Sequence, residues 1–498
     1  MSVTTIGGRS MLSLQFLTSM RSQLDDLQRQ LGTGKKSKDY AGLGLDRGLT
    51  VALRSQLAAL SGFKDTVANV GVRLEAAQST LTRMAALARE VKSATFSFDL
   101  SGSGQTVDQT VAVSSLDELF ALLNTRVGDR YLFSGRATDT PAAAAAADIL
   151  NGVDTRAGFK QVMAERLQAD LGADGLGRLV TSRTGATVSI AEDAAGSPFG
   201  FKLASITTTV SGATANAPAG SPPVESISFA GSSPAAGDTV TVRLSLPDGT
   251  SETLTLTATT TVPAGADQFS IGATNGATAL NFRNALDTAI GTLAQTALRA
   301  ASGMAAAQDF FDVDANRPPQ RVAGPPFDTA TALVDGTSSD TVTWYTGEAG
   351  TDPARTTAVV RVDPSMSIAY GARATEQGIR SIVQAVAVFA MSTFSAADPN
   401  GSEAYAALQQ RVNTALSGPP GQQKVMDIAA ELGGAQATMG AARERNIQSE
   451  ATLMDLLQGI EGVQLEEVGA QILALQTNLE ASLQTTALLY RTTLLDYL

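Results

Sequence analysis

The 498-residue sequence contains no cysteine and no histidine, and only 5% of its residues are aromatic. Without cysteine, the chain cannot form disulfides, thiolate zinc sites or a thiol nucleophile. Without histidine, it lacks the imidazole that most often serves as an acid–base catalyst near neutral pH. Catalysis would need a Ser/Lys or a carboxylate pair, and no spacing singles one out. We therefore expect a protein that is not an enzyme and that holds no metal or cofactor.

Long hydrophobic runs are also missing. No stretch of 18 apolar residues is present, so the sequence predicts no membrane span. The apolar residues among the first 20 are spaced out and interrupted by Ser and Gln, unlike the apolar core of a secretory signal. The net charge of −12 and the pI of about 4.7 oppose binding to nucleic acid or to an anionic membrane surface.

Residues 31–48, LGTGKKSKDYAGLGLDRG, look at first sight like a phosphate-binding loop. A P-loop would have glycine at position 29 and a hydroxyl residue at position 36, where this chain has Arg29 and Lys36. It would also follow a strand, whereas a helical pattern precedes it here. We predict instead a connector between two helices. Gly32 would lie just beyond the first helix, and Lys35 and Lys36 near the negative end of its dipole.

Apolar residues recur at heptad spacing near both ends of the chain, with polar residues on the other faces, as in a coiled-coil seam. The seam residues are Leu17, Met20, Leu24, Leu27 and Leu31 in the first helix, Leu53, Leu60, Val67, Leu74 and Leu81 in the second, and Leu465, Val468, Ile472, Leu475 and Leu479 near the C-terminus. Such stripes are costly in water. The two ends could cover each other within one chain. We favour burial against other copies on assembly, because the last turns are apolar on more than one face.

The middle of the chain has a different character. Alternation of Val/Leu with Thr/Ser around a Pro-Asp-Gly turn predicts a β-hairpin over residues 238–262. A helix is expected over residues 277–307, and two further strands over residues 340–363. We interpret Trp344 as a packing anchor rather than a platform for a ligand.

The sequence therefore predicts an α+β architecture. Long coiled-coil helices from both termini would pack together, with a β-rich variable insert in the middle. The expected parts are an N-terminal helical segment (1–136), a β-rich outer region with room for two subdomains (137–373), and a C-terminal helical segment (374–498). Further helices are expected over residues 115–127, 374–394, 402–416 and 422–463.

Three motifs at the ends of the chain resemble the bacterial flagellin family. LQRQLGTGKK (27–36), followed by a short loop and a second heptad helix, resembles the start of the family's chains. GDRYLFSG (128–135) is similar to the end of the family's third helix, in a form commoner among its hook–filament junction proteins. LEASLQTTALLYRTTLLDYL (479–498) resembles the family's closing helix. The resemblance covers about half of the chain, residues 10–136 and 374–498. The loop KSKDYAGLGLDRG (36–48) departs from the family's usual DDPAG or DDAAG form, so the family's loop contacts are not carried over.

The resemblance implies a structural subunit of the bacterial flagellum, exported through the type III apparatus without a cleavable signal and located outside the cell. Its partners would be further copies in a homopolymer, other axial proteins (hook-associated proteins and the filament cap), and an export chaperone. The chaperone would bind the closing helix at Leu488, Leu489, Leu494, Leu495 and Leu498.

Two subunit types fit this implication. The length and the large middle region favour a filament-forming flagellin. The YLFSG and LDYL segments favour the alternative, the hook–filament junction protein (hook-associated protein 3). A secreted coiled-coil adhesin or fibre protein is a more remote alternative, since it would not need heptads at both termini to meet.

Overall fold

The computed structural model describes residues 3–97, 106–314, 317–395 and 397–495, with the side chains of the terminal helices described from residue 14 and up to residue 488. It is 53% helix and 17% strand, so the protein is of mixed α and β structure, as predicted. Contacts divide the chain into two compact units. Unit 1 comprises residues 1–69, 361–367 and 437–498, and unit 2 comprises residues 70–360 and 368–436. The division falls within two long helices, at 69/70 and 436/437, whereas the sequence segments were drawn at 136/137 and 373/374.

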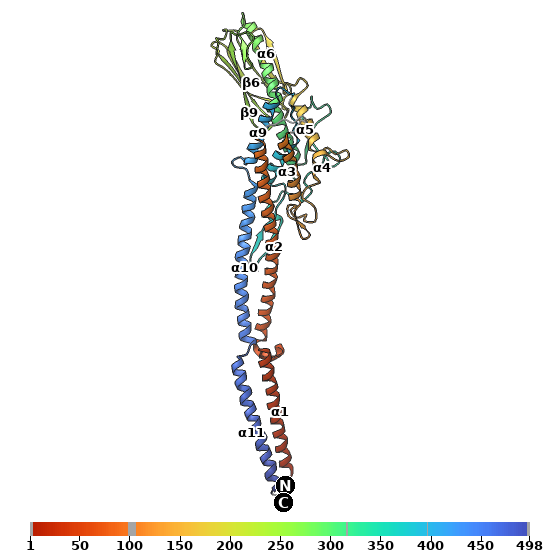
Figure 1. Ribbon diagram of the computed structural model, residues 1–498, viewed down its shortest axis with the longest axis vertical. Helices are drawn as coiled ribbons and strands as arrows, with labels where there is room; N and C mark the ends of the chain where they lie inside the picture. The colour runs from red at the N-terminus through yellow and green to blue at the C-terminus, as the bar shows by residue number, and fades with distance from the viewer. Residues whose placement is uncertain (1–2, 98–105, 315–316, 396, 496–498) are drawn as a thin grey trace. The chain divides into compact units, whose positions relative to one another are not determined.

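Unit 1 is built from helices of both ends of the chain. Helix α1 (Val3–Thr33) lies beside α11 (Leu465–Leu495) (Figure 1). The first part of α2 (Arg47–Ala94) and the last part of α10 (Val425–Glu461) complete the unit. A short 3₁₀ helix, η1 (Tyr40–Asp46), stands between α1 and α2, which confirms the predicted connector.

The end of α1 differs from the prediction by one half-turn. Gly32 is still helical, and the left-handed residue that ends the helix is Gly34, with φ of +67°. Its N–H donates to the carbonyl of Gln30 at 2.8 Å. A left-handed residue at this place costs a glycine little, because it has no Cβ to clash with the preceding turn.

The helical layer of unit 2 surrounds α8 (Gln377–Met391), whose segment RSIVQAVAVFAM is buried almost throughout. A helix that is apolar on all sides must be enclosed. Helices α3 (Val107–Leu123), α7 (Arg299–Phe311) and α9 (Gly401–Ser417) pack against it, and α5 (Phe159–Leu171) packs on α7. Unit 2 also contains α4 (Ala146–Asn151), α6 (Asn275–Leu293), a π-helical turn (Ala294–Leu298) that joins α6 to α7, a short 3₁₀ helix η3 (Ala354–Thr357), and the parts of α2 and α10 nearest to it in sequence.

The predicted helices are found, with one large shift of boundary. Residues 374–394, 402–416 and 422–463 correspond to α8, α9 and α10, and residues 277–307 to the run from α6 to α7. Helix α3, however, begins at residue 107 rather than 115. The Thr106 hydroxyl accepts from the Gln109 N–H, and the Gln109 side chain accepts from the Thr106 N–H. This capping box satisfies two otherwise unpaired donors and so starts the helix eight residues earlier.

Two four-stranded sheets form the β-rich part of unit 2, in the orders β3-β4-β7-β6 and β10-β9-β8-β5. The strands are β3 (Leu179–Thr184), β4 (Thr187–Glu192), β5 (Lys202–Thr208), β6 (Thr214–Ala219), β7 (Val224–Ser228), β8 (Thr239–Ser245), β9 (Ser251–Thr259) and β10 (Gln268–Ser270). The predicted hairpin is confirmed as the antiparallel pair β8–β9, in which Ser245 pairs with Ser251. Gly249, with φ of +81°, makes its turn.

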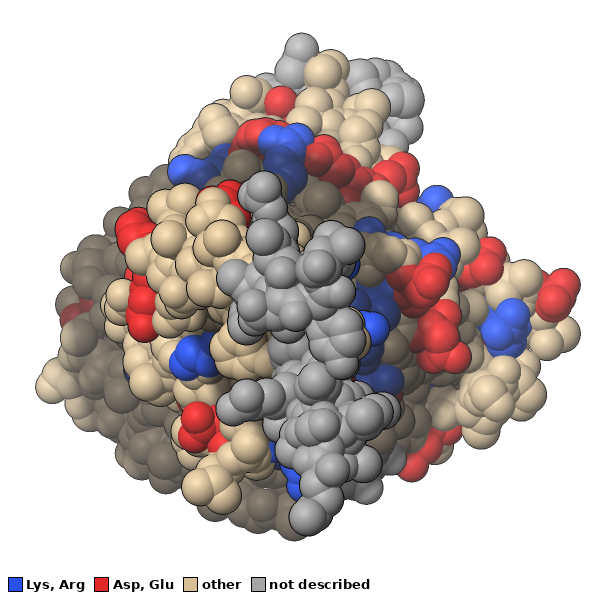
Figure 2. All heavy atoms as spheres, turned by 90° about the horizontal axis from the view of Figure 1, so that it is seen from below, with Lys and Arg blue, Asp and Glu red and all other residues tan. Residues whose placement is uncertain are grey.

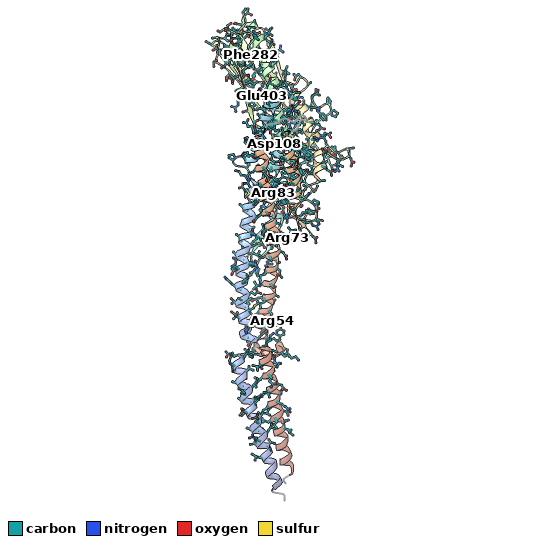
Figure 3. All side chains as sticks on the ribbon, in the orientation of Figure 1. Arg54, Arg73, Arg83, Asp108, Phe282 and Glu403 are labelled. Atoms are coloured by element: carbon teal, nitrogen blue, oxygen red, sulfur yellow. The ribbon has the colours of Figure 1, made fainter. Side chains whose placement is uncertain are left out.

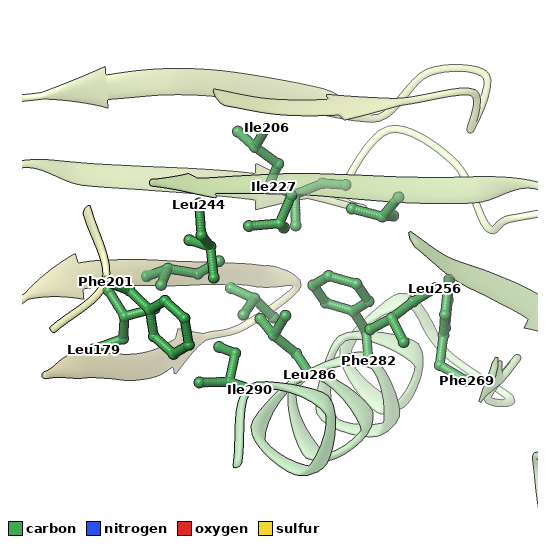
Figure 4. Packing of buried hydrophobic residues seen from close by; sticks show 14 of the residues in the cluster. Leu179, Phe201, Ile206, Ile227, Leu244, Leu256, Phe269, Phe282, Leu286 and Ile290 are labelled. Atoms are coloured by element: carbon green, nitrogen blue, oxygen red, sulfur yellow. The ribbon is translucent and has the colours of Figure 1, made fainter. Parts of the chain in front are cut away.

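The core of this part lies between the two sheets and α6 (Figure 4). Phe282, Leu286 and Ile290 project from one face of α6 and are fully buried. Phe282 packs edge-on against Phe229 and Phe269, with ring centroids 5.6 and 5.2 Å apart. Inward-facing aliphatic residues of both sheets close the core around these rings, so the sheets and α6 form one packed body.

The prediction of two strands over residues 340–363 is wrong for its first half. Thr341 and Tyr345 make only isolated bridges, and the one strand is β13 (Val359–Arg361), paired with β14 (Ser367–Ala369). Trp344 is fully buried, and its indole N–H donates to the carbonyl of Phe311 at 2.9 Å. This anchoring draws the segment onto α7 instead of into a sheet, and the role of Trp344 as a packing anchor is confirmed. Short pairs elsewhere are β1 (Arg126–Val127) with β2 (Arg130–Tyr131), and β11 (Gln320–Val322) with β12 (Leu333–Asp335).

Candidate assembly surface

Many of the heptad residues are covered within a single chain. Seven are buried, six are half-buried and two are exposed. The buried ones are Met20, Leu53, Val67, Leu74, Leu81, Val468 and Ile472, the half-buried ones are Leu17, Leu24, Leu27, Leu60, Leu475 and Leu479, and the exposed ones are Leu31 and Leu465. The preference for stripes that stay uncovered until assembly is therefore corrected for the buried residues. In unit 1, α1 contacts α11, as the other alternative expected of the two ends.

The fifteen residues do not form one continuous surface. Those of α1 and α11 belong to the same helix pair in unit 1. Leu53, Leu60 and Val67 lie on the part of α2 that runs beside α10, where Lys64 and Glu450 form an ion pair. Leu74 and Leu81 belong to unit 2, where Leu74 borders a small cavity together with Tyr131. A residue that is buried among its own neighbours is not available to another molecule.

Part of the apolar surface of unit 1 stays uncovered in the single chain. On α11, Leu465, Leu473 and Leu483 fall on one flank at helical spacing, and Leu473 is 66% exposed. Leu45 in η1, and Leu49 and Val51 in the first turns of α2, are also exposed. We define these six residues as the candidate assembly surface. All of them belong to unit 1.

A polar joint holds the two helix interruptions of unit 1 together. The turn after α1 forms an antiparallel bridge, Lys35 to Gly462, with the turn between α10 and α11. The Lys36 N–H donates to the Glu461 carbonyl at 2.7 Å, and the Val463 N–H donates to the Gly34 carbonyl at 3.1 Å. The two helix interruptions therefore lie side by side. These backbone hydrogen bonds fix the position of α1 along α11.

Glu461 is the charged centre of this joint. Its carboxylate accepts two hydrogen bonds from Arg54 (labelled in Figure 3), at 2.9 and 2.7 Å, and Lys35 lies 3.8 Å away. The guanidinium hydrogen bonds lower the pKa of the Glu461 carboxyl. The Lys36 ammonium donates to the carbonyl of Gly459 at 3.2 Å. The Lys36 ammonium thus bonds a carbonyl at the negative end of α10, and Lys35 pairs with the Glu461 side chain, in addition to their place just after α1.

We expect Glu461→Gln to lower the stability of unit 1 by about 1–2 kcal/mol at pH 7, because a two-point charged hydrogen bond is lost from a largely buried carboxylate. The pKa of Glu461 is lower in the folded chain, so its contribution is full above pH 4.5, the ordinary value, and is lost as pH falls through the folded pKa. Urea unfolding at pH 7 and pH 3 would measure the loss. Glu444→Gln, on the exposed side of α10, is the control, and equal effects of both substitutions would contradict the prediction.

Sequence reasoning missed the residues of this joint. Arg54 and Glu461 are 407 positions apart, and each occurs in a helix with other charged residues. Sequence reasoning also missed Asn446, which is buried on α10. Its side-chain amide donates to the carbonyl of Val362, in the loop 361–367, at 2.9 Å. The available signal was that a glycine-containing break follows the first seam and that another precedes the C-terminal seam.

The proposed chaperone-binding residues lie at the far end of α11. Leu488 is 59% exposed, so it is accessible in the folded chain. Leu489, Leu494 and Leu495 belong to α11, but their side chains lie outside the described residues, and Leu498 lies outside them altogether.

Charge is mixed on the visible surface. In Figure 2, acidic and basic side chains are interspersed rather than gathered by sign. Within the described residues, no group of three or more acidic side chains is arranged to hold a metal ion, and no helix is both long and apolar enough to cross a membrane. No family model matches the chain, and no curated protein matches it significantly.

Proposed function

We propose that the protein is a structural subunit of the extracellular bacterial flagellum that polymerises into the filament. The motifs at both ends of the chain support the proposal through their resemblance to the flagellin family. The structural observation that favours it most is the pairing of α1 with α11, which leaves an apolar flank uncovered (Figure 1). We further propose that these two helices wind as a coiled coil through their heptad seams.

In this proposal the free energy of assembly comes from the candidate assembly surface. Leu465, Leu473 and Leu483 are each about half to two-thirds exposed. Covering them in each new contact would contribute about 3 kcal/mol of apolar burial. A regular polymer repeats this contact for every subunit, so a modest gain at one flank suffices to drive elongation.

The second candidate is the hook–filament junction protein, which the GDRYLFSG segment favours. In this chain Phe133 and Ser134 of that segment are fully buried, and Gly135 adopts a φ of +64°. The segment also ties to the chain after the middle region, because the Ala374 N–H donates to the Phe133 carbonyl at 2.9 Å.

Electron microscopy of the concentrated full-length protein, seeded with short flagellar filament fragments, tests both candidates. Regular elongation of the seeds would support the filament subunit. Monomers that bind only to the ends of isolated hooks would support the junction protein. Monomers that ignore both structures would contradict the proposal and favour a secreted adhesin or fibre protein.

The substitution Leu473→Asp tests the surface itself. We expect it to stop seeded elongation, because the charge would be buried without a partner in the subunit contact. Its thermal unfolding should match that of the wild type within about 0.5 kcal/mol, because the residue is exposed in the single chain. Val72→Asp, at an exposed position of α2 in unit 2, is the matched control. Normal elongation by Leu473→Asp would remove this flank from the proposal.

A further inference from the structure

An apolar pocket of about 250 Å³ opens in the helical layer of unit 2, away from the candidate assembly surface. It lies among α5, α7, α9 and the end of α8. Its wall consists largely of carbon and sulfur, from Met163, Leu167, Met391, Phe394 and Leu408. Three of these, Met391, Phe394 and Leu408, are themselves buried in the unit. The pocket therefore reaches from exposed positions such as Ala164 down to buried side chains of the unit.

The depth of the pocket depends on Gly303. A Cβ atom at this position would stand 3.0 Å from Val388 Cγ1 and 3.9 Å from Met163 Sδ, so a side chain there would press on the packed wall. The flexible thioethers of Met163 and Met391 adapt to irregular apolar ligands at little cost. At about 250 Å³, the space is smaller than the ~300–1,000 Å³ typical of sites for drug-sized molecules, and fits a narrow chain better than a ring system.

Two cationic side chains, Lys160 and Arg299, line the otherwise apolar pocket. Within the described residues the Lys160 ammonium has no acidic partner. Arg299 donates to the carbonyl of Thr393 at 2.9 Å and lies 3.9 Å from Asp398, a distance at which a carboxylate ligand can compete. Lys160 also occupies the first turn of α5, whose dipole is positive at that end.

The carbonyls at the end of α8, which would repel an anion, are largely engaged. The Gln109 amide donates to the carbonyls of Phe389 and Ser392, both at 2.8 Å. The carbonyl of Thr393 accepts a hydrogen bond from Arg299. The charged groups that line the pocket are therefore the Lys160 ammonium, which has no acidic partner in the described residues, and the Arg299 guanidinium, which Asp398 meets only at 3.9 Å.

We propose that this pocket binds a free, unbranched alkyl carboxylate of medium chain length, with the chain against the methionine-rich wall and the carboxylate between Lys160 and Arg299. The apolar wall supplies affinity in proportion to chain length, and the two cations select an anionic head group over a neutral or cationic one. The site is independent of the assembly proposed above.

Isothermal titration of the full-length protein with decanoate tests the proposal. We expect one site per chain, binding about tenfold weaker for octanoate because two buried methylenes are lost, and no binding of decyltrimethylammonium. Lys160→Glu should weaken decanoate about tenfold, and Ala164→Trp, at an exposed position that lines the pocket, should abolish binding. Lys38→Glu, at an exposed position in unit 1, is the matched control.

Equal decanoate affinity in the wild type and in both pocket variants would overturn the site. Binding of decanol or of decyltrimethylammonium with the affinity of decanoate would overturn the selection for a carboxylate. Circular dichroism of the two variants shows whether each is folded, and Lys160→Gln offers a milder change that keeps the stem of the side chain.

Discussion

Replacing Ile472 with aspartate is expected to separate α11 from α1 while leaving unit 2 folded. Ile472 is 8% exposed and lies four residues, about one helical turn, after Val468, which is also buried. An unpaired carboxylate in this seam costs about 3–5 kcal/mol, because it loses both its hydration and the apolar contact of the isoleucine. That cost is comparable with the whole stability of a pair of helices, so we expect the pair to open.

The measurement is amide hydrogen exchange followed residue by residue. Protection should fall along α1 and α11 and persist in α8, which is enclosed within unit 2. Leu473→Asp changes the neighbouring residue on the exposed flank and should leave all protection intact. If Ile472→Asp kept α1 and α11 protected, the seam would not hold the pair together.

Replacing Glu225 with leucine is expected to raise the stability of unit 2 at pH 8 by about 3 kcal/mol. Glu225 lies on β7, between β4 and β6, and is fully buried among apolar residues. Neither carboxylate oxygen has a hydrogen-bond partner in the structure. Burial without a partner raises the pKa of this carboxyl from 4.5 to about 7.

The sign of the pH dependence follows from the raised pKa. The folded chain holds the proton more tightly than the unfolded chain. The contribution of this group to stability is therefore fully present below pH 4.5 and is lost as pH rises through the folded pKa of about 7. The rise from 4.5 to about 7 corresponds to about 3 kcal/mol, at about 1.4 kcal/mol per pH unit. Above pH 7 the loss stays constant.

Urea unfolding of the wild type and two variants at pH 5 and pH 8 checks this prediction. Glu225→Leu should lose the dependence and gain stability, since it replaces an unpaired polar group by an apolar one. Glu225→Gln should match the wild type at pH 5 and exceed it at pH 8, and should stay less stable than Glu225→Leu because its amide is still buried without a partner. Subtracting the unfolding free energy of Glu225→Gln from that of the wild type at each pH isolates the effect of Glu225 from that of the other carboxylates. If the stability difference between the wild type and Glu225→Gln were the same at pH 5 and at pH 8, the raised pKa of Glu225 would be refuted.

Part of this site was readable in the sequence. Alternation along VESISF places Glu225 on the same side as Ile227 and Phe229, both of which are buried. The pattern therefore identifies a carboxyl that faces a core. It does not say whether a lysine or arginine from another strand meets it there, and that contact decides between a paired carboxylate and a protonated acid.

Local periodicity determined the secondary structure and the side of each element that is buried. The 3–4 spacing placed Met20 and Ile472 in a seam, and alternation around Pro-Asp-Gly placed the β8–β9 hairpin, because side-chain directions repeat every 3.6 residues in a helix and every two in a strand. Periodicity carries no information about the partner of a face. The tertiary structure alone decided that α1 contacts α11 within one chain and that Arg54 meets Glu461 across 407 positions. Such pairings depend on the balance between burial and the entropy of closing a long loop, which no local pattern of residues records.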